Sequence, residues 1–231
     1  MILRNAFLLA GLASMLLYPT TASAALLTFF TKASYDAQLV TSGLVDKNFT
    51  NFEAVATGSK GVSFSADGIG FVGSIATPLR VDSTGSSGGF TNSGTNFLGY
   101  DDPILSDFTG GDTFDLVLPA GTRAVKLSMS SPDDLSIVPG FGRLTVTSGS
   151  DTAFADTLAA NAQTISGATK GYFLGIIDTT APFISANVSF QGNALFRVDD
   201  VGVAAVPEPS SLGLAAVAGL VGFARRRRRS K

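Results

Sequence analysis

The chain has 231 residues, a net charge of −2 and no Cys, His or Trp. These absences exclude disulfide bonds, thiol nucleophiles and the usual zinc ligands, so the fold depends on the burial of apolar residues. Hydrophobic residues make up 45% of the chain and charged residues 15%, and the 26 Gly and 18 Phe favour β structure in a single domain.

The first residues have the organisation of a secretory signal. Arg4 precedes an almost unbroken apolar stretch at 6–17. Ala22 and Ala24 then give the small-x-small pattern that signal peptidase recognises, because its cleft admits only small side chains. We predict cleavage before Ala25, which makes residues 1–24 a signal peptide. An N-terminal membrane anchor is the alternative, and the short apolar stretch disfavours it.

One short helix is expected near the start of the mature chain. Ser34 is a candidate N-cap, Tyr35 and Leu39 stand four residues apart, and Gly43 is placed to close the helix. This order of cap, apolar pair and glycine is typical of a short amphipathic helix.

The rest of the body predicts short strands separated by Gly, Pro, Asp, Asn or Ser. Several segments alternate, as in Val62–Ser65 and Val125–Met129, so that their apolar side chains share one face. The expected strands are 26–31, 49–54, 61–66, 69–75, 96–100, 113–118, 124–129, 143–147, 171–177, 183–190 and 194–203.

Two segments are expected to be surface loops, the Ser/Gly/Thr-rich stretch at 82–96 and part of 148–168. No long helical period separates the strands, which disfavours a parallel α/β sheet. The pattern therefore predicts an all-β body at residues 25–205. We expect a two-sheet antiparallel sandwich with jelly-roll-like connections.

The last 26 residues have three parts, VPEPSS at 206–211, an apolar span at 212–224 and a basic cluster. The cluster is Arg225, Arg226, Arg227, Arg228 and Arg229, which the positive-inside rule keeps in the cytoplasm. As a helix the span would reach about 20 Å, short of the roughly 30 Å hydrocarbon core. It therefore suits a temporary hold beside a protease, and prolines in VPEPSS keep the preceding strip extended.

This order of parts resembles the PEP-CTERM sorting signal of Gram-negative bacteria, whose motif is matched by Pro207, Glu208 and Pro209. The resemblance covers 206–231 and implies cleavage by exosortase, a membrane-embedded cysteine protease, during a transient stay in the inner membrane. It also implies delivery to the cell surface or beyond, in the context of exopolysaccharide and biofilm. An ordinary tail anchor is the alternative, whereas a GPI signal would not end in five arginines.

Removal of both ends changes the charge of the body. Residues 1–24 and 208–231 hold seven of the sixteen basic and one of the eighteen acidic residues, so nine and seventeen remain, a net charge of −8. Such a body repels nucleic acid and anionic lipid, and it is compatible with cations and neutral sugars.

Loose motifs spread over 26–204 resemble the sandwich domains that accompany PEP-CTERM signals, and they are NFEAVATG at 51–58, NFLGYD at 96–101, GYFLGI at 171–176 and FRVDDVGVA at 196–204. The resemblance implies a β-sandwich with no established general activity. Related folds among carbohydrate-binding modules pair an early Phe-Glu with a late Asp-Asp-Val around a structural calcium.

The corresponding residues here are Glu53, Asp199 and Asp200. Calcium takes several oxygen ligands, which carboxylates and backbone carbonyls supply. Neighbouring residues of a strand point to opposite faces, so only one of Asp199 and Asp200 faces a given site unless the strand has a bulge. Solvated carboxylates at strand ends are the alternative to a calcium site.

Three motifs resemble catalytic or metal-binding signatures without their usual context. GxGxxG at Gly68–Gly73 precedes an extended pattern, whereas a dinucleotide site needs a helix there. GxSxG at 85–89 has no His to activate its serine. GGDTFD at 110–115 resembles a calcium β-roll repeat, which needs several copies, so we expect a turn into a strand.

Paired acids leave one catalytic alternative. Asp101-Asp102, Asp133-Asp134 and Asp199-Asp200 are adjacent pairs, and adjacent acids do not by themselves form the facing pair of a glycosidase. We therefore expect no enzyme activity, and a structural or adhesive surface protein is the favoured function. A carbohydrate-binding module is the alternative.

Sugar binding and ice binding each predict particular surface residues. Most Phe residues are expected in the core, so Tyr35, Tyr100 and Tyr172 are the candidates for stacking on a sugar ring. The tail is also described as an ice-binding protein C-terminal domain. An ice-binding face would need a regular Thr array, and Thr145 and Thr147 are the nearest approach to one.

Overall fold

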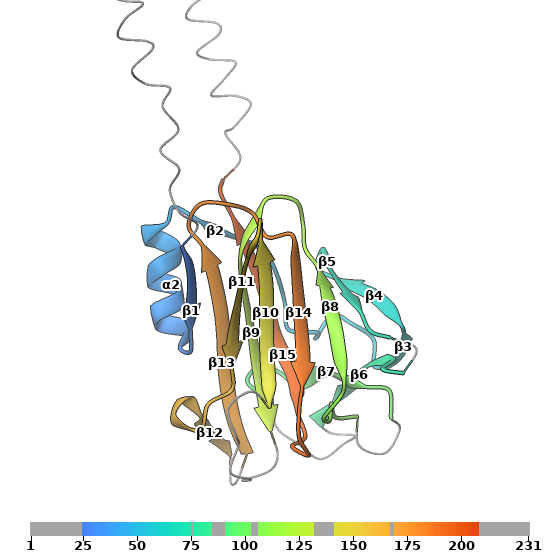
Figure 1. Cartoon of the computed structure of the whole chain (residues 1–231). Coiled ribbons are helices and arrows are strands. Elements are labelled where there is room, and N and C mark those ends of the chain that lie inside the picture. Colours follow the sequence, from blue (N-terminus) through green and yellow to red (C-terminus); the bar gives the residue numbers. More distant parts are fainter. Residues whose placement is uncertain are drawn as a thin grey trace, which may run out of the picture.

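The computed structural model describes residues 25–74, 76–84, 91–102, 106–131, 141–166 and 169–207. These residues form two sheets with only antiparallel pairing, and neither sheet is closed into a barrel (Figure 1). The prediction of an all-β body with two antiparallel sheets is confirmed. Jelly-roll connectivity stays a prediction.

The larger sheet runs in the order β1 (Leu26–Phe29), β13 (Thr169–Asp178), β9 (Thr122–Ser131), β15 (Arg197–Ala205), β7 (Asn96–Tyr100), β6 (Leu79–Ser83) and β3 (Gly58–Gly61). In addition, β12 (Gln163–Ser166) pairs with β13, and β2 (Val45–Thr50) pairs with β15. Strand β15 is therefore held on both edges, by β9 on one and by β7 and then β2 on the other.

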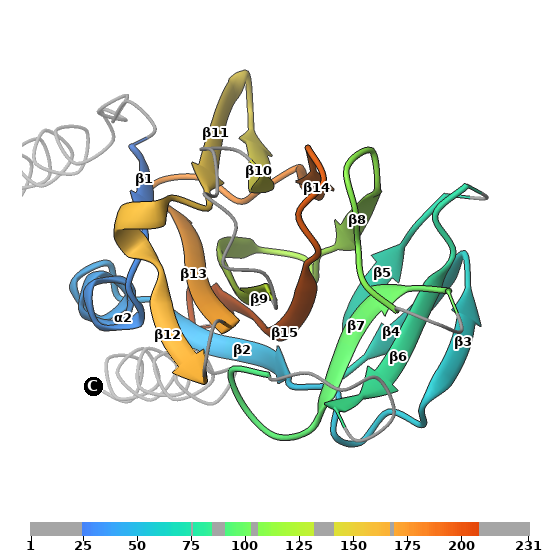
Figure 2. The ribbon, with the colours of Figure 1, turned by 90° about the horizontal axis from the view of Figure 1, so that it is seen from below.

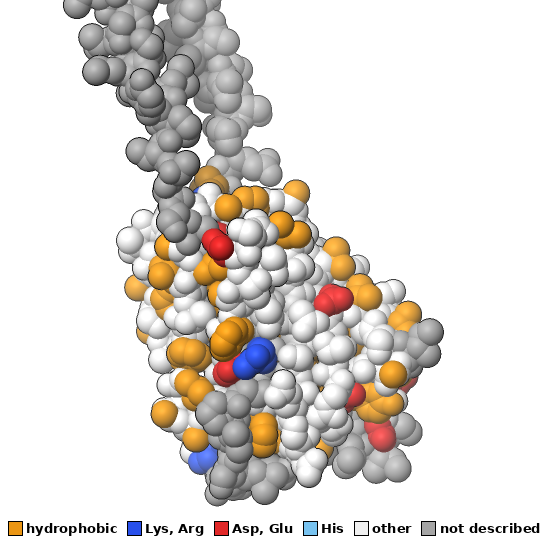
Figure 3. Space-filling view, in the orientation of Figure 1, with side chains coloured by type: hydrophobic (Ala, Val, Ile, Leu, Met, Phe, Trp, Pro, Cys, Tyr) orange, Lys and Arg blue, Asp and Glu red, His pale blue; other side chains and the backbone are white. Residues whose placement is uncertain are grey.

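The smaller sheet runs in the order β11 (Asp151–Asp156), β10 (Gly142–Ser148), β14 (Ser185–Phe190), β8 (Thr113–Val117), β5 (Ile69–Val72) and β4 (Ser63–Ala66). Its strands alternate as predicted. In β10, Leu144 and Val146 are fully buried, while Thr145 and Thr147 lie on the outer face. Figure 3 shows that this outer face is mostly neither charged nor hydrophobic.

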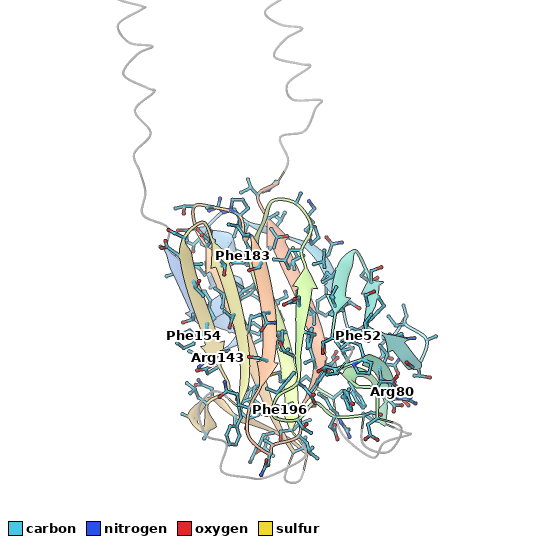
Figure 4. All side chains as sticks on the ribbon, turned by 45° about the vertical axis from the view of Figure 1, so that its right-hand side comes forward. Phe52, Arg80, Arg143, Phe154, Phe183 and Phe196 are labelled. Carbon is cyan, nitrogen blue, oxygen red and sulfur yellow. The ribbon has the colours of Figure 1, made fainter. Side chains whose placement is uncertain are left out.

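Phenylalanine rings fill the space between the sheets. Phe108 and Phe190 stack with ring centroids 4.7 Å apart, and Phe190 also lies 5.7 Å from Phe196. Burial of each ring contributes about 1.5–3 kcal/mol. The placement of most Phe residues in the core is thus confirmed. Phe154 is an exception, because it lies on the surface of β11 beside Arg143 (Figure 4).

The expected helix is α2 (Lys32–Thr41), and it covers part of the outer face of the larger sheet. Tyr35 and Leu39 are its buried residues, as predicted. The predicted N-cap is wrong, because the Thr31 side chain accepts the backbone N–H of Ser34 and so caps the helix one turn earlier. Gly43 ends the helix with φ +65°, the left-handed conformation that glycine adopts without strain.

Four strands lie where the sequence predicted loops or no element. They are β3, β6, β11 and β12. The polar residues of β11 and β12 resemble loop residues because each strand pairs on one side only, with β10 and β13 respectively. The strand expected at 49–54 instead spans Val45–Thr50, since Phe52 has φ +63° and turns the chain away.

Both ends of the described chain lie at one end of the sandwich, because β1 begins and β15 ends at the top of Figure 1. The carbonyl of Ala25 accepts the N–H of Thr179. Ala205 pairs with Thr122 of β9 and with Val45 of β2. We call this the terminal end of the domain, and the opposite end the distal end.

Candidate functional site

A bulge in β15 brings two neighbouring carboxylates together. The strand is in register with β9 at Val198 and again at Val201, but only Ser128 of β9 lies opposite the two residues between them. Those residues are Asp199 and Asp200. A bulge of this kind breaks the alternation of side chains. Asp199 and Asp200 can therefore face the same site, which was expected only if the strand had a bulge.

Both carboxylates bind the same residue of the loop that precedes β7. The backbone N–H of Ser93 donates to Asp199 Oδ2 at 2.6 Å, and the Ser93 hydroxyl donates to Asp200 Oδ1. A loop that the sequence marked only as Ser/Gly/Thr-rich is therefore attached to the outer face of the larger sheet. We call residues 91–95 the clamped loop.

Glu53 holds the other end of the clamped loop. Its Oε1 accepts the backbone N–H groups of Thr95 at 2.6 Å and Asn96 at 2.7 Å. These two hydrogen bonds, Asn96 first, lower the pKa of Glu53. Gly94 has φ +58°, and a Cβ there would lie 2.3 Å from Glu53 Oε1. The carboxylate thus needs glycine at this position to approach the loop.

Asp199 is the most perturbed acid of the site. Its side chain is fully buried, and Oδ1 has no hydrogen-bond partner. Burial, followed by the negative charge of Asp200, raises the pKa of Asp199 to about 8. Burial also raises the pKa of Asp200, while Lys126 and Lys32 oppose this shift. The pair therefore places two neighbouring carboxylates where burial and their mutual repulsion both oppose ionisation.

The three predicted calcium ligands lie around the clamped loop but do not form one cluster. Within the described residues, no three acidic side chains come close enough to hold a metal ion together. Glu53 is directed to backbone N–H groups, whereas Asp199 and Asp200 meet at Ser93. Calcium binding stays a prediction, and Asp199 and Asp200 are the acidic residues that lie close enough to each other to bind one ion.

Two of the three tyrosines expected to stack on sugars are buried, so that expectation is wrong for them. Tyr35 is fully buried under α2, and Tyr172 is 3% exposed within the core. Tyr100 is half-buried at the end of β7. The two buried rings pack against apolar residues of the core and of the cluster beneath α2. The sequence pattern could not assign these partners.

The motifs at 68–73 and 110–115, which resemble catalytic or metal-binding signatures, lie in turns and strands. Asp67 and Gly68 form the turn of the β4–β5 hairpin, and β5 follows as a strand. Gly110 and Gly111 precede β8 in a turn, where Asp112 accepts the N–H of Thr109. The expected turn into a strand is confirmed. Asp133-Asp134 and the motif at 85–89 lie outside the described residues.

The sorting motif begins where the folded domain ends. Strand β15 ends at Ala205, and Val206 and Pro207 are exposed. The predicted signal residues Ala22 and Ala24, the motif residues Glu208 and Pro209, and the cluster Arg225–Arg229 lie outside the described residues. Among the described helices, none has the length and apolar character needed to cross a bilayer.

Residues 205–229 match the PEP-CTERM protein-sorting motif. The resemblance of the tail to this signal is confirmed, and the motif implies a secreted, membrane-transiting protein that an exosortase processes. No curated protein matches the chain.

Two solved structures are distantly similar to the chain. One is the K2 cleaved adhesin domain of Lys-gingipain, at 13% identity and a TM-score of 0.43, covering 70% of this chain and 98% of that one. The other is TmCBM61, solved in complex with beta-1,4-galactotriose, at 14% identity and a TM-score of 0.31, covering 58% of this chain and 86% of that one. These likenesses are too distant to assign a ligand.

Proposed function

We propose that this chain is an exported surface or extracellular-matrix protein, cut at both ends, whose β domain has a structural or adhesive role among exopolysaccharides. The observation that carries the proposal is the PEP-CTERM motif at 205–229. Signal peptidase would remove residues 1–24, and exosortase would cut near Pro207–Pro209. The acidic charge of the remaining body favours neutral sugars over nucleic acid as partners.

The position of the motif suits a protease that works at the membrane. Val206 and Pro207 are exposed directly after β15, so the cut would fall just outside the fold and leave the sheet intact. The start at Ala25 lies at the same terminal end. Both processing sites would then face the membrane together, while the domain extends away from it.

Among the described residues, acids considered for catalysis in the sequence analysis instead bind a loop or form an ion pair. Asp199 and Asp200 bind Ser93 of the clamped loop, and Asp101 forms an ion pair with Arg80 at 3.4 Å. These contacts favour a non-enzymatic role for the domain, because carboxylates that fix loops are not placed to face each other across a substrate.

Intact mass of the protein recovered from the cell surface and the medium tests the proposal. We expect a chain that starts at Ala25 and ends between Pro207 and Ser211. A Glu208→Ala variant, which alters only the motif, should keep the tail and stay in the membrane. A wild-type mass that retains residues 212–231 would show a plain membrane anchor and contradict the proposal.

A calcium ion at Asp199 and Asp200 is a second proposal, and the unpartnered buried Oδ1 of Asp199 favours it. Calcium would supply the positive charge that this oxygen lacks, with backbone carbonyls completing its shell. We expect calcium, relative to EGTA, to raise the melting temperature of wild type and not that of Asp199→Asn. An unchanged wild-type melting temperature would contradict calcium binding.

A further inference from the structure

A pocket lies on the outer face of the larger sheet beside the clamped loop, and it shares Asp200 with the contacts that hold this loop. Its volume is about 210 Å³. Strands β9, β13 and β15 form its floor, and α2, β12 and the clamped loop contribute Lys32, Gln163 and Asn92. In Figure 2, α2 and β12 flank β13 on this side of the domain. Six segments of the chain thus meet around one hollow.

The floor of the pocket presents one aromatic ring with free space beside it. Tyr172 and Leu174 point into the core, so the alternation of β13 turns Phe173 outward. The ring of Tyr35 holds Phe173 by an edge contact, with centroids 5.6 Å apart. At Gly171, a Cβ would lie 2.4 Å from Asn92 Oδ1. Glycine at this position therefore lets the side chains of Asn92 and Ile165 approach the strand at the edge of the pocket.

The wall of the pocket carries hydrogen-bonding groups of several kinds. Asn92 and Gln163 offer amides that both donate and accept, and Ser128 offers a hydroxyl. Lys32 and Asp200 add one charge of each sign, and Lys32 is already in an ion pair with Asp36. The set is close to neutral, which disfavours a phosphate or a polyanion as the ligand.

An aromatic face surrounded by amides, a hydroxyl and a carboxylate matches the chemistry of a sugar. A sugar ring has an apolar C–H face that packs on an aromatic ring, and its hydroxyls both donate and accept hydrogen bonds. A pocket of about 210 Å³ holds about seven waters at about 30 Å³ each. That volume is suited to one six-membered ring with its hydroxyls, and not to a long oligomer.

We propose that this pocket binds a single residue of a neutral polysaccharide, with Phe173 against the ring and Asn92, Gln163 and Asp200 bonded to its hydroxyls. The inference rests on the proposed adhesive function and adds the site and the class of ligand. It also gives the clamped loop a role, because Ser93 fixes the loop next to Asn92.

Binding of the full chain, purified in detergent, to dextran, galactan, mannan and xylan, with anionic alginate for comparison, tests the inference by affinity electrophoresis in the presence of EGTA. We expect at least one of these polysaccharides to retard the wild type. Phe173→Ala should weaken that binding about tenfold, the effect of one aromatic contact. Phe154→Ala is the matched control, since Phe154 is exposed on β11, and it should bind like the wild type.

Two further variants separate loss of the pocket from loss of the fold. Gln163 is exposed, so Gln163→Ala leaves the core intact and should weaken binding several-fold. Gly171→Ala places a methyl group against Asn92 Oδ1 and should weaken binding by displacing that amide. The inference is wrong if none of the four polysaccharides binds, if all pocket variants bind like the wild type, or if only anionic alginate binds. Because the full chain is used, failed processing in cells would not affect this result.

Discussion

At Asp199, burial in the sheet opposes ionisation of the carboxyl group. Asp199 is the fully buried member of the Asp pair, and one of its two oxygens has no partner. Its pKa of about 8 lies far above the value of about 3.9 in an unfolded chain. The native state therefore retains a proton that the unfolded state has lost over most of the physiological range.

This difference fixes the sign of a pH effect. Between about pH 4 and pH 8 the native state binds more protons than the unfolded state, so the free energy of unfolding falls as pH rises. Asp200, whose pKa is also raised, acts in the same direction. We expect Asp199→Asn to flatten the fall measured by urea unfolding between pH 5 and 8 in EGTA. Parallel curves for wild type and variant would contradict the assignment.

Tyr35 also buries a polar group, in this case an uncharged hydroxyl. Its ring packs between Phe29 and Phe173, but its buried hydroxyl has no hydrogen-bond partner. Tyr35→Phe keeps the ring contacts and removes the unsatisfied group, which should stabilise the domain by about 1 kcal/mol. The melting temperature should rise by about 2–4 °C. A lower melting temperature would show that the hydroxyl is bonded in solution.

Sequence patterns identified the acids of the site but not their partners. Glu53, Asp199 and Asp200 do surround one loop, yet periodicity has no information about which loop backbone a carboxylate will bind. Ser93 was part of a stretch predicted only to be a surface loop. Phe173 was missed because an outward Phe beside Tyr172 looks like another core residue. The glycines at 171 and 175 were the available signal, since glycine on each side of Phe173 lets Asn92 and Tyr35 approach the strand.

At the scale of elements, the clamped loop is held at two points by different strands. Glu53 follows β2 and the Asp pair belongs to β15, so the loop links two neighbours in the larger sheet. The position of the clamped loop next to β7 therefore depends on these side-chain contacts as well as on backbone hydrogen bonds between strands. Such a loop should open locally when one of its anchors is removed.

Glu53→Ala tests this local role. The variant removes the acceptor of the Thr95 and Asn96 N–H groups and should cost about 1 kcal/mol, the low end for charged acceptors because Glu53 is exposed. We expect faster hydrogen exchange at Thr95 and Asn96, with exchange in β10 unchanged. Glu53→Gln retains an acceptor oxygen and should show a smaller change. Equal acceleration throughout the domain would indicate global destabilisation instead.

The strands themselves were largely predictable because alternation and turn residues act locally. Asn96–Tyr100 matches β7, and 113–118 and 143–147 match β8 and β10 within one residue at each end. Sheet order was not predictable, since it depends on pairing between segments far apart in the chain. The bulge in β15 likewise becomes visible only in its register with β9.

For the whole molecule, the pocket and the termini lie toward opposite ends. In the β13–β9 pair, Gly171 faces Ser130 at the distal end, and Ile177 faces Ala124 at the terminal end. At about 3.3 Å per residue, Phe173 lies roughly 17 Å from Asp178, which pairs with Leu26. A protein held at its tail would therefore display the pocket away from the membrane.

Site-directed labelling tests this orientation in a chain that has no native cysteine. In cells without exosortase, a bulky maleimide should modify Gln163→Cys several-fold faster than Ala120→Cys, because exposed Ala120 lies at the terminal end. In detergent solution the two rates should be similar. Equal rates on cells would show that the domain does not stand on its terminal end.

The continuity between β15 and the sorting tail also has a mechanical consequence. A pull on the tail runs along β15, and the ladders to β9 and β2 lie across that direction. Hydrogen bonds loaded in this way resist together in shear, whereas those at a frayed edge would open one by one. Strands β9 and β15 also line the pocket. Tension between a bound polymer and an anchored tail would thus pass through the most firmly held strand of the sheet.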